Sequence, residues 1–102
     1  MIDALQARLA ELAALTQTTT YGALARDLGL AGPAMIARLT TALESLMDHD
    51  AAAREPLRAA LVNARNSDLP ARGFFDKAAL LGFDVSDPAA FVARHRAALT
   101  VR

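Results

Sequence analysis

The chain has 102 residues, a formal net charge of zero, 54% hydrophobic residues and 22% charged residues. This length and composition predict one globular domain over residues 1–102 with a single core, and they argue against a disordered chain. The sequence has no cysteine, which excludes disulfides, thiolate metal sites and a cysteine nucleophile.

Membrane insertion and export are not expected. No apolar run approaches the roughly 18 residues of a membrane span. The first residues carry no basic segment, and Glu11 interrupts any signal-like stretch, so we expect a cytoplasmic protein with no membrane contact.

The charges are unevenly placed. Residues 1–50 hold three arginines against six carboxylates, whereas residues 51–102 hold eight cations against five carboxylates. This distribution is compatible with a basic face on the second half, but ordinary solvated surface charge is the favoured interpretation, because domains without net charge rarely have the basic surface of nucleic-acid binders.

The first half of the chain reads as three helices. Leucines three and four residues apart predict a helix over residues 2–15. The threonine-rich residues 16–20 favour a short strand and an N-cap for a second helix over residues 21–28, which Gly29 is suited to end.

Pro33 suits the first position of a third and longest helix, which extends to about residue 48. Its spacing predicts a buried stripe of Met35, Ile36, Leu39, Leu43, Leu46 and Met47. The opposite face would then expose Arg38, Thr41, Glu44, Ser45 and Asp48.

The second half reads as a strand, a turn and two helices. We expect a strand over residues 57–63 that pairs with the segment near residues 18–20, and then a turn at residues 66–70. Helices follow over residues 74–82 and, after the cap signal Ser86-Asp87-Pro88, to residue 99. The four phenylalanines are expected to anchor the core: Phe74, Phe75, Phe83 and Phe91.

This order of elements is typical of a winged helix-turn-helix. The fold class expected is therefore mainly α, with about five helices and a minimal β-hairpin or strand pair. The helix-turn-helix core would span about residues 21–48, a wing about residues 57–73, and the C-terminal helices residues 74–99.

Five residues are candidates for nucleic-acid binding. Small residues at Gly32-Pro33-Ala34 would let the third helix approach a DNA groove closely, with Arg38 and Thr41 exposed on it. Arg65 and Arg72 flank the turn and would contact phosphate from a wing. Tyr21 is the fifth candidate.

Tyr21 lies in the segment Thr20-Tyr21-Gly22-Ala23-Leu24-Ala25. This segment resembles the start of the helix-turn-helix in the C-terminal domain of alkylguanine-DNA alkyltransferases and alkyltransferase-like proteins. The resemblance extends more loosely over residues 18–82. It implies a winged-helix fold, a third helix facing a DNA groove and a phosphate near Tyr21.

The sequence departs from that family at the reactive centre. The Pro-Cys-His-Arg segment of the family corresponds here to Pro56-Leu57-Arg58-Ala59, so the nucleophile is absent. Alkyl transfer requires a thiolate, and we therefore expect no catalytic residues, no enzyme activity and no cofactor. The recognition helix also begins Ala34-Met35-Ile36-Ala37, without the family's arginine, so base flipping is not expected.

Each candidate also has a purely structural interpretation. Tyr21 would be a half-buried ring with its hydroxyl in water, and Arg38 would pair with Glu44 or lie in solvent. The arginines at the turn would simply keep it soluble. His95, between two arginines, is expected at the surface.

Two functions remain open at this point. One is a non-catalytic protein that binds double-stranded DNA. The alternative is a helical protein–protein interaction or homo-oligomerisation domain, such as a homodimer, without nucleic-acid binding. No metal is expected in either case, because the consecutive residues Asp48-His49-Asp50 do not converge on one ion.

Overall fold

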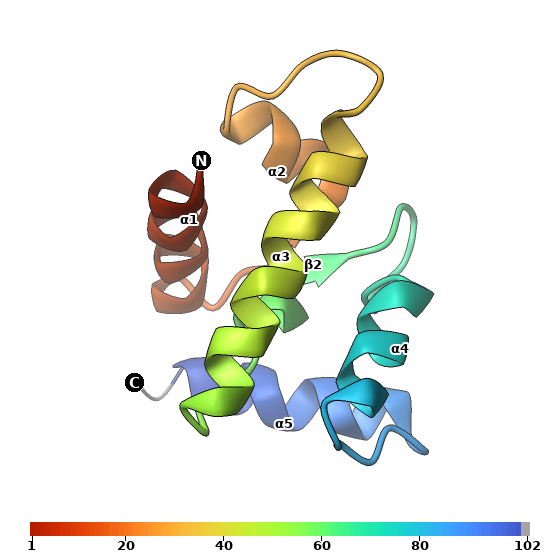
Figure 1. The fold of residues 1–102 in the computed structure, drawn as a ribbon. Helices are drawn as coiled ribbons and strands as arrows, with labels where there is room; N and C mark the ends of the chain where they lie inside the picture. The colour runs from red at the N-terminus through yellow and green to blue at the C-terminus, as the bar shows by residue number, and fades with distance from the viewer. Residues whose placement is uncertain (101–102) are drawn as a thin grey trace.

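The computed structural model describes residues 1–100 and is mainly helical (Figure 1). The α-helices are α1 (Ile2–Ala14), α2 (Tyr21–Asp27), α3 (Met35–Ala52), α4 (Arg72–Leu80) and α5 (Pro88–Thr100). The remaining elements are a 3₁₀ helix, η1 (Arg58–Leu61), and two short strands, β1 (Thr19–Thr20) and β2 (Val62–Asn63). This confirms the expected small, mainly α fold with a strand pair.

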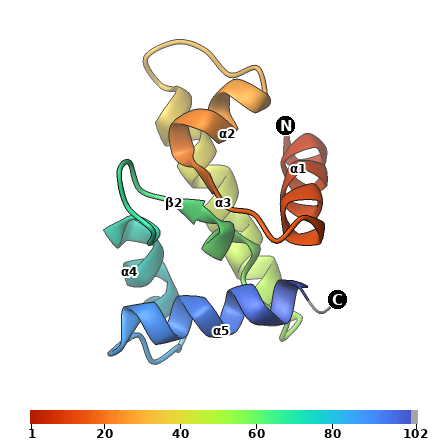
Figure 2. The ribbon, with the colours of Figure 1, turned by 180° about the vertical axis from the view of Figure 1, so that it is seen from behind.

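Helix α3 runs through the middle of the molecule (Figures 1 and 2). Helix α1 lies along one side of it and α4 along the other, while α2 lies at its N-terminal end and α5 crosses near its C-terminal end. None of these helices over residues 1–100 has the length and apolar character needed to cross a membrane.

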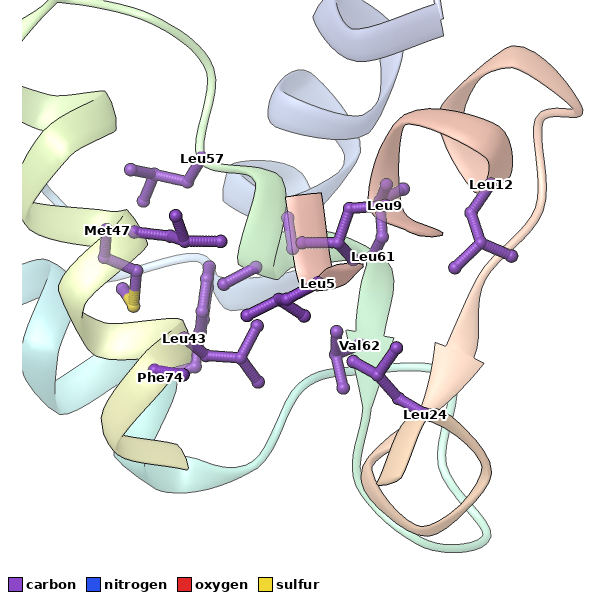
Figure 3. Packing of buried hydrophobic residues seen from close by; sticks show 14 of the residues in the cluster. Leu5, Leu9, Leu12, Leu24, Leu43, Met47, Leu57, Leu61, Val62 and Phe74 are labelled. Carbon is purple, nitrogen blue, oxygen red and sulfur yellow. The ribbon is translucent and has the colours of Figure 1, made fainter. Parts of the chain in front are cut away.

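The core forms around η1. Figure 3 shows leucines from α1 and α3 converging on Leu61 and Val62, at the centre of the molecule. Ala59 and Ala60 are buried in η1, and their small side chains let α1, α3 and α5 all contact this short segment. Phe74 and Phe91 are buried in the same core, and Phe75 and Phe83 pack against it. Burying each large apolar side chain contributes about 1.5–3 kcal/mol.

The two strands pair in parallel, with Thr19 opposite Val62 and Thr20 opposite Asn63. The predicted pairing between these segments is thus confirmed. The predicted strand over residues 57–63 is wrong before residue 62, because side chains take up its backbone amides. The amide of Leu57 donates to His95 Nδ1 at 2.9 Å, and that of Arg58 donates to Asp50 Oδ2 at 3.0 Å.

The segment expected to form a wing contains no β-hairpin within the part of the chain that the structure describes. Strand β2 leads into a loop in which the Ala64 amide donates to the Leu69 carbonyl at 2.9 Å. Helix α4 then begins at Arg72, two residues earlier than predicted.

The turn before α3 also differs from the prediction. Pro33 is not the first helical residue, because the Met35 amide donates to the Gly32 carbonyl and closes a turn with Pro33 at its second position. The fixed φ of proline favours this position. Gly29, at φ +71°, does end α2 in the left-handed region as expected. Ile36 was predicted to be buried but is 40% exposed, because the first turn of α3 lies at the edge of the core.

Candidate nucleic-acid interface

The start of α2 is fixed from two directions. The Thr20 side-chain oxygen accepts a hydrogen bond from the Ala23 amide at 3.2 Å and so caps the helix. The backbone of Thr20 is paired with Asn63 of β2. Tyr21, the first residue of α2, is therefore held next to the loop that follows β2.

A surface groove of about 620 Å³ opens at this junction. We call it the basic groove; it is lined by Thr20, Tyr21, Gly22, Arg26, Ile36, Ala64, Arg65 and Ala71. Two arginines and two hydroxyl-bearing residues contribute to it, and no carboxylate does. The structure thus brings two of the predicted residues, Tyr21 and Arg65, into one site.

Tyr21 is half-buried, as the structural interpretation expects. Burial raises the pKa of its hydroxyl; a backbone hydrogen bond with Ala71 acts in the opposite direction, and the negative charge of Glu44 raises the pKa further. The hydroxyl therefore stays protonated at neutral pH and is able to donate a hydrogen bond to an anion.

An apolar pocket of about 140 Å³ lies on the other side of Tyr21. Its walls are formed largely by Ile36, Leu43 and Met47 of α3 and by Phe74 of α4, with Thr40 and Glu44 adding polar atoms. Tyr21 and Ile36 line both this pocket and the basic groove.

Arg38 and Thr41 lie together in a different place. They line a groove of about 510 Å³ with Met1 and Ile2, at the start of α1. Thr41 Oγ1 donates to the carbonyl of Ala37 at 3.1 Å, so its oxygen is left free to accept. Arg38 has no ion pair with Glu44 or with any other residue among the first 100.

Arg72 lines neither the basic groove nor the groove at the start of α1. Its side chain is 93% exposed in the first turn of α4, where Nε lies 3.8 Å from Asp76 Oδ2. The prediction that Arg72 flanks a wing is wrong, because the helix starts early enough to include it. An exposed pair of this kind contributes little to stability.

Arg26 was missed by the sequence analysis. It lies on α2, and a β-carbon placed on Gly22 would be 3.8 Å from Arg26 Nη1, so the guanidinium lies beside that glycine. The spacing of four residues between Gly22 and Arg26 was the available signal, since such residues are neighbours on a helix.

The acidic end of α3 has a structural role. Asp50 is buried and bonded to Arg58, and Asp48 Oδ1 lies 2.8 Å from Lys77 Nζ. No group of three histidine, aspartate or glutamate side chains within residues 1–100 is placed to hold a metal ion.

His95 is not a surface residue, contrary to the prediction. Its ring is partly buried, packs against Phe83 and Phe91 with centroid distances of 5.5 and 4.5 Å, and accepts the hydrogen bond from Leu57. Burial, followed by the positive charge of Arg94, lowers its pKa, and Asp50 opposes this effect.

In the predicted resemblance Leu57 corresponds to the cysteine of the alkyltransferases, and it is fully buried. It therefore offers no nucleophile.

No family model, curated protein or solved structure matches this chain. The resemblance to alkyltransferases therefore stays a prediction from the Tyr21 segment.

Proposed function

We propose that this chain is a non-catalytic DNA-binding protein that places the first half of α3 in a groove of duplex DNA. The observation that carries this proposal is the arrangement of unpaired arginines around that half of the helix. Arg38 lies on one flank, beside the start of α1, and Arg26 and Arg65 lie on the other, in the basic groove. None of the three side chains has a hydrogen bond or ion pair with residues 1–100.

Cations on both flanks of an exposed helix favour binding of that helix to duplex DNA. A helix with its side chains is about 10–12 Å across and fits a major groove about 12 Å wide, which is bordered by phosphates on both sides. Between the flanks, α3 exposes Ala37, Thr41 and Ser45, which are small enough to allow close approach.

The charge along α3 favours its N-terminal half. Arg38 is the only cation in the first ten residues of the helix and Glu44, at their end, is the only carboxylate among them, whereas Asp48 and Asp50 lie in the last turns. The two aspartates are already matched with Lys77 and Arg58, so this end of α3 is occupied by contacts within the protein.

The roles within the interface differ. Arg38 is the fourth residue of α3 and is exposed, and recognition helices reach base edges from such N-terminal positions. Arg65 lies in a loop beside the helix and suits a phosphate contact, which positions the protein without reading sequence.

The competing proposal is homo-oligomerisation or protein binding through exposed apolar side chains. The large ones within residues 1–100 are Met1, Ile2, Leu15, Ile36 and Leu80. They come from both ends of α1, the start of α3 and the end of α4, and singly exposed apolar residues are common on monomers. The unpaired arginines favour DNA as the partner.

A salt titration of binding to random-sequence duplex DNA tests the proposal. The logarithm of the affinity should fall linearly with the logarithm of salt concentration, with a slope of about −0.9 for each phosphate neutralised. Absence of binding at low salt, together with a stable dimer by light scattering, would overturn the proposal in favour of oligomerisation.

Mass spectrometry after incubation with alkylated DNA tests the non-catalytic part of the proposal. The chain should gain no alkyl adduct, because Leu57 provides no sulfur at the family's nucleophile position. A stoichiometric adduct would contradict it.

A further inference from the structure

We propose that the basic groove binds a phosphodiester group of the DNA backbone, with Arg26 and Arg65 as its two cationic ligands. This rests on the proposed DNA-binding function and adds Arg26, a residue that the sequence did not single out. The groove holds two guanidinium groups that have no hydrogen bond or ion pair with residues 1–100, together with the side chains of Thr20 and Tyr21, and none of its lining residues is a carboxylate. Two unneutralised cations that line one groove call for an anionic ligand.

Arg26 is left uncompensated by its neighbours. The adjacent carboxylate, Asp27, is occupied by Arg8, whose Nε lies 3.1 Å from Asp27 Oδ2. The Arg26 side chain instead extends back along α2 to Gly22. Because Gly22 has no side chain, the guanidinium lies near the backbone at the start of the helix, on the wall of the groove.

Arg65, the second cation of the groove, is carried by an ordered loop. Asn66 follows it at φ +58°, and the Ser67 amide donates to the Ala64 carbonyl at 3.2 Å. The loop is also tied to α5, because Arg96 Nη1 donates to the Asp68 carbonyl at 3.0 Å. The backbone that carries Arg65 is therefore fixed before any ligand binds, which reduces the entropic cost of binding.

The chemistry of the groove suits the phosphodiester. Guanidinium groups present paired N–H donors that match the two non-bridging oxygens of a phosphate. Tyr21 also lines the groove, and its hydroxyl is protonated at neutral pH. Ile36 of α3 also lines the groove, so a backbone phosphate bound there would lie directly beside the proposed recognition helix.

The experiment measures binding of the full chain to random-sequence duplex DNA for Arg26→Gln, Arg26→Lys and the matched control Arg94→Gln. Arg94 is an exposed arginine on α5, which crosses near the other end of α3. Arg26→Gln should weaken binding about tenfold and make the salt slope shallower by about 0.9, the amount for one phosphate contact. Arg26→Lys should keep the slope, and Arg94→Gln should change neither quantity.

The thermal unfolding midpoint of each variant is measured alongside, and Arg26→Gln should match the unchanged protein because Arg26 has no hydrogen bond or ion pair with residues 1–100 to lose. Inorganic phosphate should displace DNA no better than sodium chloride of equal ionic strength. Stronger displacement would show that the groove takes free phosphate, and would overturn the assignment to the DNA backbone.

Two other results separate the two proposals. DNA binding that is unchanged in Arg26→Gln would overturn this assignment and leave the proposed function standing. Absence of DNA binding by the unchanged protein would overturn both.

Discussion

Asp50 is a buried charge that joins three parts of the chain. It lies on α3 and is 5% exposed. Its oxygens accept hydrogen bonds from the Arg58 amide at 3.0 Å and from Arg58 Nη2 at 2.8 Å, and Arg58 in turn reaches Gln6 of α1 at 3.4 Å. A buried carboxylate is tolerated only with such partners, so this pair fixes the start of η1.

Replacing Asp50 should therefore lower the stability of the folded protein. We expect Asp50→Ala to lower the free energy of unfolding by about 3 kcal/mol, because the Arg58 guanidinium and amide both lose their acceptor. Asp48→Ala, which removes the more exposed partner of Lys77 on the same helix, should cost less than about 1 kcal/mol. Urea denaturation measures both, and equal losses would contradict the structural role given to Asp50.

His95 makes the stability depend on pH. In the folded protein its Nδ1 accepts a hydrogen bond from Leu57, and burial lowers its pKa below the ordinary value of about 6.5. The unfolded chain therefore binds a proton more readily than the folded protein. The stabilisation is complete above about pH 6.5 and is lost as the pH falls below that value.

Chemical denaturation at a series of pH values tests this prediction. The free energy of unfolding should decrease as the pH is lowered from about 7 toward 5. His95→Gln should flatten this dependence, and His49→Gln, at an exposed position on α3, should leave it in place. A dependence that persists in His95→Gln would show that another group is responsible.

The surroundings of some polar residues were predictable from the sequence and those of others were not. Tyr21 was predictable because a local motif marks it, and Arg38 because the helical period places it outside the core. Arg58, His95 and Arg96 were not, because their roles come from partners 8 to 38 residues away in sequence. Nothing in a local pattern shows which distant amide or carbonyl a side chain will meet.

At the scale of elements, Arg96 connects α5 to the centre of the molecule. Its guanidinium donates to the Ala60 carbonyl of η1 at 2.8 Å, to the Asp68 carbonyl, and to the Asn63 side chain of β2. Asn63 also donates to Thr18 Oγ1 at 3.3 Å. The two-residue strand pair is therefore supported by side-chain bonds as well as by its own ladder.

Arg96→Lys should weaken this connection, because lysine keeps the charge but cannot donate to three acceptors in the same plane. We expect a loss of about 1–3 kcal/mol in the free energy of unfolding and faster hydrogen exchange at the amides of β2 and the following loop. Arg94→Lys, two residues earlier on α5 and exposed, is the matched control. Unchanged exchange in Arg96→Lys would contradict the role of this arginine.

The helices were predictable in number and approximate position because α1 and α3 carry a clear apolar period and the others are marked by cap residues or by a glycine at their end. The predicted strand over residues 57–63 failed from residue 57 to residue 61, where side chains from α3 and α5 capture the amides of Leu57 and Arg58. The predicted wing failed for a related reason. Strand β2 takes its partner from before α2, so the segment after it remains a loop.

At the scale of the whole molecule, the ends of α3 differ in their partners. Around its first half, Arg26, Arg38 and Arg65 have no ion pair with any of the first 100 residues, whereas the acids of its last turns are matched with Arg58 and Lys77. A net charge of zero conceals this arrangement. Composition alone predicts no basic surface, and the sequence places the excess of cations in residues 51–102, whereas the fold brings Arg65 into one groove with Arg26 from the first half.

The central claim is that DNA contacts the first half of α3 and the basic groove. An NMR titration of the ¹⁵N-labelled chain with duplex DNA tests it most directly, because each backbone amide reports on its own surroundings. We predict chemical-shift changes concentrated at Arg26, Arg38, Thr41 and Arg65, with the amides of α5 unchanged. Changes confined to α5, or none at a low salt concentration, would contradict the account.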